Sequence, residues 1–247
     1  MSSFAPLQAL LDRYYALEFH HNPQLAARLQ AVQNWQKKRM EHTHAELFAI
    51  PAHQLMTQYF LTRLYAGPDF AILAQQFERI IEKAKKFEKF VPTSTIRTGC
   101  EGVELAVLAI ELDQDLAKFL LEHPEHDAST NFDPAGDFSD RLVIELYHQA
   151  DQSAARYHQL DLLDQLGNSL DKYVRSFMTQ QAFKMAKGAA LRHNFAPVYT
   201  FLDEGFAAMK PLKSAEVFIG VFTRDERELI ARVHAGTPDP FKRNEAP

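Results

Sequence analysis

Residues 59 to 65 read Tyr59-Phe60-Leu61-Thr62-Arg63-Leu64-Tyr65, and apolar side chains dominate this short segment. On an α-helix, apolar residues cover one broad face and extend around its edge: Leu55, Met56, Tyr59, Phe60, Leu61, Leu64 and Tyr65. Gln58, Thr62 and Arg63 form a narrow polar strip. The pattern predicts a helix over 52–66, closed by Gly67 as a C-terminal cap and buried at the centre of the fold.

A second segment, residues 98–122, is apolar nearly all round if it is helical. Thr98-x-x-Glu101 matches a capping box, which predicts a helix start at Thr98, with Pro92 as the alternative start. We expect this helix to be the second central element, because its neighbours must pack on most of its surface.

The remaining periodicities are also helical and predict helices over 4–21, 24–49, 69–90, 139–178 with a break near 149–153, 197–209 and 214–234. Small residues over 184–190 would let a backbone approach closely around Gly188. The predicted fold is all-α: one domain over 1–247, a bundle of eight to ten helices around two apolar central helices. A loop at 123–138 and an extended tail at 236–247 complete it.

Composition narrows the class of protein further. The chain of 247 residues is 46% hydrophobic and has 19 Phe against 9 Gly, which favours thick helix–helix packing. An alternative is that some phenylalanines line a cavity. The formal charge of −5 gives no general attraction for nucleic acid. The single Cys100, the lack of a signal peptide and the lack of a transmembrane segment predict a cytoplasmic protein.

Four short motifs occur in order along the chain: Trp35-Gln36-x-x-Arg39, the segment 59–65 with the following residues 66–70, Phe201-Leu202-x-x-Gly205-Phe206, and the tail segment 236–241. Together they resemble a bacterial family known by the motif Phe-Phe-Leu-Glu-Glu-Leu-Tyr (FFLEELY), a family without an assigned function. The two adjacent glutamates of that motif stand here as Thr62 and Arg63. The resemblance therefore implies no acid–base role for these two positions.

The pattern Glu-x-x-His occurs as Glu18/His21, Glu41/His44 and Glu145/His148, with the spacing used by di-iron carboxylate bundles. Only Glu18 and His21 continue an apolar helix stripe and are expected to point inward. Glu145 and His148 lie on a polar face, and Glu41 and His44 share a side with Lys37. Since a di-metal site needs two inward pairs and further carboxylates, a histidine bonded to a neighbouring carboxylate is the favoured interpretation.

Two further groups of residues are weaker candidates for binding. His123-x-x-His126-Asp127, with Asp133 and Asp137, could hold a divalent ion, but the spacing is loose. Lysines at 83, 85, 86 and 89 could meet an anionic membrane or nucleic acid, but Glu82 and Glu88 interrupt them and favour a solvated face. Phosphate-binding loops, dinucleotide fingerprints and nucleophile motifs are missing from the sequence.

We therefore predict a non-catalytic cytoplasmic binding protein, with a groove or cavity lined by aromatic side chains for a partner helix or an apolar small molecule. Tyr59, Phe60, Arg63 and Tyr65 are the predicted binding residues. No catalytic residue, cofactor or nucleic-acid partner is expected. The alternative function is a di-metal (iron) carboxylate oxidase with Glu18, His21, Glu145 and His148 among its ligands.

Overall fold

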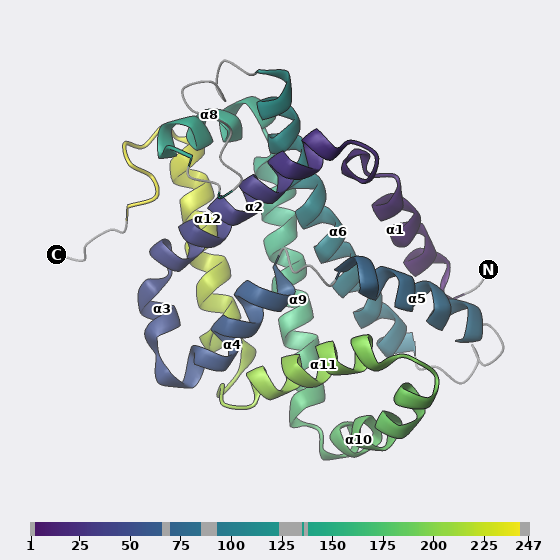
Figure 1. Cartoon of the computed structure of the whole chain (residues 1–247). Helices are drawn as coiled ribbons and strands as arrows, with labels where there is room; N and C mark the ends of the chain where they lie inside the picture. Colours follow the sequence, from purple (N-terminus) through teal and green to yellow (C-terminus); the bar gives the residue numbers. More distant parts are fainter. Residues whose placement is uncertain (1–2, 66–69, 85–92, 124–134, 136–137, 243–247) are drawn as a thin grey trace.

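The fold consists of α-helices and short helical turns (Figure 1). A computed structural model describes residues 3–65, 70–84, 93–123, 135 and 138–242. Over these ranges there are helices and no strands, so the prediction of an all-α fold is confirmed. The α-helices are α1 (Ala5–Tyr15), α2 (Pro23–Thr43), α3 (Ala45–Ala49), α4 (Gln54–Tyr59), α5 (Phe70–Ala84), α6 (Thr93–Glu122), α8 (Asp140–Ala150), α9 (Ser153–Arg175), α10 (Phe177–Arg192), α11 (Ala196–Met209) and α12 (Ile219–His234).

The long helix α6 is the centre of the bundle, as its all-round apolar pattern predicts. It packs against α1, α2, α8 and α9, and α12 covers the other side of α9. Helix α6 begins at Thr93, so Thr98 is a buried residue inside the helix. The predicted capping box at Thr98 is therefore wrong, while the alternative start near Pro92 agrees with the structure.

The segment 52–66 is not one helix. It forms a 3₁₀ turn (Pro51–His53), the short helix α4 and a π-helical turn (Phe60–Leu64), in which the Tyr65 N–H donates to the Phe60 carbonyl at 2.9 Å. Among its apolar side chains Met56 and Phe60 are buried, whereas Leu55 is exposed. The prediction that this segment is buried on most of its circumference is wrong, because Leu55, Gln58 and Thr62 are exposed and another side faces a cavity that is described below.

Several predicted helices end earlier than their apolar patterns do. The first ends at Tyr15, since Leu17 has an extended backbone (φ −66°, ψ 136°) and begins a 3₁₀ turn over Glu18–His20. The second breaks at His44, between α2 and α3. The predicted break near 149–153 is confirmed, and there Asp151 adopts a left-handed conformation with φ 45°.

The C-terminal segment is folded against the bundle over residues 236–242. The chain turns at Gly236, whose φ is 68°, and the Phe241 ring is buried against Trp35 with a centroid distance of 5.3 Å. An extended tail is therefore a wrong prediction for these residues. Other predictions lie outside the described residues: the Gly67 cap, the lysines at 85, 86 and 89, and nearly all of the loop at 123–138 with its candidate ion ligands His126, Asp127, Asp133 and Asp137.

Candidate functional site

An apolar, partly open cavity of about 830 Å³ lies between the helices of the bundle. Its wall is built by side chains from α1, α2, α5, α6, α9, α10 and α11 and from the segment 59–65. Many of the aromatic residues of the chain contribute to this wall: Phe4, Tyr14, Phe19, Phe70, Phe77, Tyr173, Phe183, Phe201 and Phe206. Part of the unusual phenylalanine content therefore surrounds a space, while Phe60, Phe218 and Phe222 belong to the packed core.

The segment 59–65 forms one wall of this cavity. Tyr59, Arg63, Leu64 and Tyr65 line it, which explains why these side chains are only half-buried. Helix α11 closes against the segment, where the Tyr59 hydroxyl donates to the Phe201 carbonyl at 3.1 Å. The approach is tight at Gly205, since a Cβ atom there would lie 2.9 Å from the Tyr59 hydroxyl oxygen. Arg63 pairs with Glu204 of α11, with 2.9 Å between Nε and Oε2.

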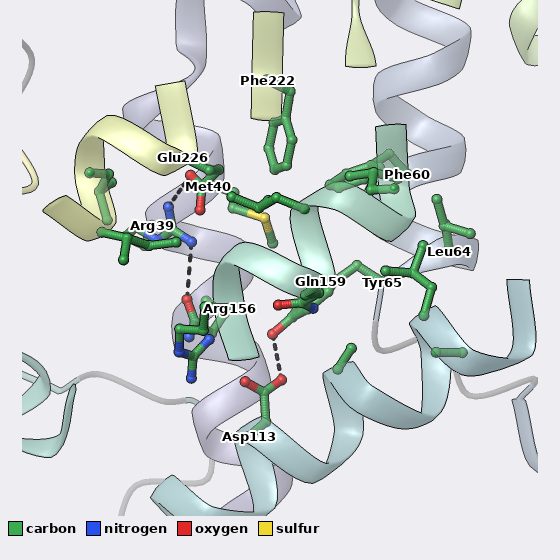
Figure 2. Close-up of a pocket in the computed structure, with 18 of the residues that line it drawn as sticks. Arg39, Met40, Phe60, Leu64, Tyr65, Asp113, Arg156, Gln159, Phe222 and Glu226 are labelled. Atoms are coloured by element: carbon green, nitrogen blue, oxygen red, sulfur yellow. Dashed lines mark hydrogen bonds and ion pairs between the residues drawn. The ribbon is translucent and has the colours of Figure 1, made fainter. Parts of the chain in front are cut away.

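A smaller and more polar chamber of about 90 Å³ adjoins the cavity (Figure 2). The two spaces share wall residues: Leu64, Tyr65, Gly102, Ala106, Ala109, Asp113 and Leu163. Among these, Tyr65 and Asp113 are the polar pair, and the Tyr65 hydroxyl donates to Asp113 Oδ2 at 2.6 Å. This hydrogen bond therefore stands at the boundary between the apolar cavity and the polar chamber.

Asp113 is almost completely enclosed, with 2% of its surface exposed. Burial raises the pKa of its carboxyl group, and the opposing influence of Arg156, Tyr65 and Arg39 does not cancel this effect. Burial and the neighbouring Asp113 together raise the pKa of Tyr65 well above its usual value. The Tyr65 hydroxyl therefore keeps its proton and remains a hydrogen-bond donor at neutral pH.

On the far side of the chamber, three buried charged or ionisable groups meet. Arg39 of α2 forms an ion pair with Glu226 of α12, and His44 Nε2 lies 2.6 Å from the same Glu226 oxygen. Burial alone would raise the pKa of Glu226, but Arg39 and His44 outweigh it and lower this pKa to about 2. Gln36 links the group to Tyr147, since its Nε2 donates to the Tyr147 hydroxyl at 2.6 Å and its Oε1 accepts from Arg39.

Arg156 of α9 is the second guanidinium in the chamber, with 7% of its surface exposed. It stacks over the Tyr147 ring at 4.4 Å and donates to Gln152 at 3.2 Å. Within the described ranges it makes no ion pair, although its charge acts on Asp113. Arg39 Nε, Arg156 Nε and His44 Nδ1 are buried without a hydrogen-bond partner in the same ranges. The chamber therefore holds two N–H donors, Arg39 Nε and Arg156 Nε, that still need an acceptor.

The four residues predicted for binding lie around these two spaces. Tyr59, Arg63 and Tyr65 line the large cavity, and Phe60 and Tyr65 line the small one. Phe60 also belongs to the packed core, since its ring lies 4.8 Å from that of Phe222. The structure thus brings the four residues to one region, and their role in binding stays a prediction.

The structure does not gather the four candidate metal ligands. Glu18 and His21 are exposed, so the prediction that they point inward is wrong; Glu18 pairs instead with Lys118 at 2.7 Å. His148 is exposed on α8 beside His234. In the parts of the chain that are described, no group of three or more His, Cys, Asp or Glu side chains could hold a metal ion.

The prediction for His44 is also wrong. The helical periodicity of the sequence placed this residue on a polar side together with Lys37. It is buried and bonded to Glu226, since the helix break at His44 turns its ring into the core against Phe222 at 4.4 Å. The sequence favours a histidine that is hydrogen-bonded to a neighbouring carboxylate. Such a bond does occur, but it joins His44 to Glu226 and does not involve His21.

Sequence reasoning missed Asp113, Arg156 and Glu226 as site residues. A signal was present, because each occupies a position of an apolar stripe: Glu226 lies between Phe222 and Leu229, Arg156 lies four residues before Leu160, and Asp113 follows Leu112 inside the long apolar helix α6. A charged residue at a core position of a helix indicates either a buried ion pair or a binding site.

The motifs that are far apart in the sequence come together in space. Trp35 packs on Phe241, Gln36 and Arg39 belong to the polar chamber, and Tyr59 contacts Phe201 with 5.5 Å between ring centroids. Helices long and apolar enough to cross a membrane are missing from the described part of the chain.

Comparison with known proteins gives one match. No curated protein and no solved structure matches the chain. Residues 16–240 match the family described as Domain of unknown function (DUF8198), and this range includes the polar chamber, the segment 59–65 and most of the cavity wall. The chain belongs to this DUF8198 family.

Proposed function

We propose that this protein binds an apolar small molecule that carries one uncharged, oxygen-containing head group. The observation that carries the proposal is the apolar cavity of about 830 Å³ next to a buried polar chamber. Protein interiors are close-packed and leave few voids larger than a water molecule. A cavity of this size lies within the range of small-molecule sites, which are mostly apolar with a few convergent polar groups.

The geometry favours a small molecule over a partner helix. A helix with its side chains is about 10–12 Å across and needs a long open groove with polar groups along its edges. Here helices from both ends of the chain contribute to the wall, and the hydrogen-bonded pair Tyr65 and Asp113 lies where the cavity meets the polar chamber. An elongated molecule that enters with its head group first would place each of its parts against matching chemistry.

The charges of the chamber favour an uncharged head group. The chamber holds two guanidiniums, Arg39 and Arg156, and two carboxyl groups, Asp113 and Glu226. A carboxylate head would lose its hydration and bring a further carboxyl group beside Asp113, which is costly in a buried site. A hydroxyl or carbonyl oxygen would accept a hydrogen bond from Arg156 Nε or Arg39 Nε at much lower cost. The proposal involves binding alone and no chemical step.

Fluorescence titration with N-phenyl-1-naphthylamine, an uncharged apolar dye, tests the proposal. The variant Ala106→Phe places a ring in the wall that both spaces share, and Ala231→Phe makes the same change on the exposed face of α12 as a control. We expect saturable binding to the wild-type protein and to Ala231→Phe. Binding to Ala106→Phe should be weaker by at least about tenfold, since the added ring takes up ligand space.

Competition between dodecan-1-ol and dodecanoate for the bound dye tests the head group. The alcohol should displace the dye at a lower concentration than the carboxylate does. Equal dye affinity in Ala106→Phe and Ala231→Phe would place the dye outside the cavity and overturn the proposal, provided that both variants keep the wild-type circular dichroism spectrum. The Tm of Ala106→Phe gives a second measurement. If the new ring fits into the cavity without strain, this Tm should not fall below that of the wild-type protein.

A further inference from the structure

Helix α10 has an apolar and basic outer face that no other part of the described chain covers. None of its residues is buried. The side chains of Phe177, Met178 and Met185 are 73%, 81% and 82% exposed, and Leu191 is exposed as well. Surface-exposed apolar residues are common singly, but four large ones on one helix of 16 residues form a patch that indicates an interaction site.

The charge of α10 has one sign. Its sequence contains Lys184, Lys187 and Arg192 and no Asp or Glu, although the whole chain has a formal charge of −5. All three basic side chains are exposed. The basic character continues beyond the helix, because Arg79 of α5 donates to the carbonyls of His193 and Asn194 and Lys83 lies over the Phe195 ring at 4.8 Å.

The inner face of α10 covers the apolar cavity. Thr179, Ala182 and Phe183 line the cavity, and the Phe183 ring stacks on Tyr199 of α11 at 4.4 Å and meets Phe206 edge-on at 4.9 Å. In Figure 1, α10 lies at the edge of the bundle below α11, at the opposite end of the molecule from α8. One side of this helix therefore belongs to the cavity wall and the other side faces solvent.

We propose that the outer face of α10 binds the surface of an anionic lipid bilayer. A helix with basic residues next to exposed Phe, Met and Leu lies in the plane of a bilayer interface, with the apolar side chains among the acyl chains and the basic ones at the lipid phosphates. Nucleic acid would match the three cations but would leave Phe177, Met178 and Met185 without an apolar environment. The bilayer satisfies both groups of side chains.

The location of α10 also gives the bilayer contact a role, and this step alone rests on the proposed function. An apolar ligand is poorly soluble in water and partitions into the bilayer. The inner side of α10 lines the cavity and its outer side faces solvent. Binding of the outer side to a bilayer would therefore bring the cavity next to the membrane that contains the ligand. Ligand transfer would then require α10 to move away from α11, where the Phe183 ring contacts Tyr199 and Phe206.

Vesicle flotation tests the bilayer contact with the full-length protein. One set of vesicles consists of phosphatidylcholine alone. In the other set about one lipid in three is the anionic phosphatidylglycerol. Two double variants change α10: Lys184→Glu with Lys187→Glu removes the cations, and Met178→Gln with Met185→Gln removes apolar area. The matched control is Arg141→Glu with Arg224→Glu, which has the same charge change at exposed positions on α8 and α12.

We expect the wild-type protein and the control to bind the anionic vesicles and to bind neutral vesicles more weakly. The lysine variant should lose at least about tenfold in partitioning, since each basic residue near an anionic surface contributes appreciably to binding. The methionine variant should lose affinity without any change in charge. Equal binding by the lysine variant and the control, or no binding by the wild-type protein, overturns the inference.

Two further measurements separate this inference from its alternatives. Binding to a DNA duplex that depends on the lysines but not on the methionines would identify a site for nucleic acid and exclude the lipid proposal. N-phenyl-1-naphthylamine titration without vesicles reports on the cavity alone. If the lysine variant still binds the dye but no longer binds anionic vesicles, the inference is supported. If the wild-type protein binds vesicles but not the dye, only the proposed function is refuted.

Discussion

Phe60 and Thr62 are two residues apart and have very different surroundings. The Phe60 ring is buried against Phe222 and Phe218, whereas Thr62 is exposed and its hydroxyl donates to the Gln58 carbonyl of its own turn at 2.7 Å. The sequence predicts this contrast correctly, because a narrow polar strip on an apolar helix faces water even when the helix is irregular.

We expect Phe60→Ala to lower the free energy of unfolding by about 3–5 kcal/mol, since it removes a buried ring and leaves a cavity. Thr62→Ala should cost less than about 1 kcal/mol, because it removes one local hydrogen bond on the surface. Urea unfolding of the two single variants measures both values. Equal, small losses would mean that Phe60 is not part of the packed core.

The buried group of Arg39, His44 and Glu226 predicts a dependence of stability on pH. The pKa of Glu226 is lowered in the folded protein from 4.5 to about 2, so its ionised form stabilises the fold above pH 4.5. This contribution, on the order of 3 kcal/mol from the pKa difference, is lost as the pH falls from about 4.5 to about 2. Asp113 has the opposite effect on stability: burial raises its pKa, so its ionisation at higher pH lowers the free energy of unfolding.

Unfolding measured between neutral pH and pH 2 for the wild-type protein, Glu226→Gln and Asp113→Asn separates these two effects. Glu226→Gln should be several kcal/mol less stable than the wild-type protein at neutral pH, since it leaves Arg39 without its partner. That difference should shrink below pH 4.5. Asp113→Asn should cost much less at neutral pH, and an equal cost in the two variants would contradict our assignment of the charges.

At the scale of the helices, two glycines distinguish close packing from open surface. A Cβ atom at Gly205 would approach the Tyr59 ring, where α11 meets α4. A Cβ atom at the exposed Gly188 of α10 would meet no neighbour within 4 Å among the described residues. The small residues over 184–190 would allow a close helix contact around Gly188, but none of the described residues makes one there. The pattern shows that a close approach is sterically allowed, but another helix must be present to use it.

Gly205→Ala should lower the free energy of unfolding by about 1–3 kcal/mol, because the new methyl group displaces Tyr59 and weakens its bond to the Phe201 carbonyl. Gly188→Ala should raise it by about 0.5–1 kcal/mol, since alanine is the better helix former at an exposed position. Thermal unfolding of both variants gives the signs directly. Stabilisation by Gly205→Ala would show that the contact between α4 and α11 is loose.

The positions of the helices were more predictable than their ends. Periodicity identified α6, the break before α9 and the locations of α11 and α12. It could not show that the segment 52–66 breaks into three helical turns, because all three kinds of turn give similar apolar periodicities over a few residues. The π-helical turn is visible only in the backbone hydrogen bond between Tyr65 and Phe60.

At the scale of the molecule, the sequence predicts a groove or cavity lined by aromatic side chains, but it could not show where that cavity lies or which helices enclose it. The same aromatic residues that predict a thick core also line an empty space, and helical periodicity does not distinguish a side chain in contact with its neighbour from one that faces a void. The polar chamber was hidden for a related reason. Arg39, Arg156 and Glu226 come from three helices that are far apart in the sequence, and only packing brings them together.

The central claim is that the interior of the bundle is a binding site, and the most direct test is a crystal structure of the protein with 12-bromododecan-1-ol. The anomalous signal of bromine locates the end of the apolar chain, and the electron density locates the hydroxyl group. We predict that the bromine lies inside the cavity and that the hydroxyl group lies in the polar chamber, within hydrogen-bonding distance of Tyr65, Asp113 or Arg156. A bromine signal only on the outer surface, or a cavity filled by rearranged side chains of the protein itself, would contradict the account.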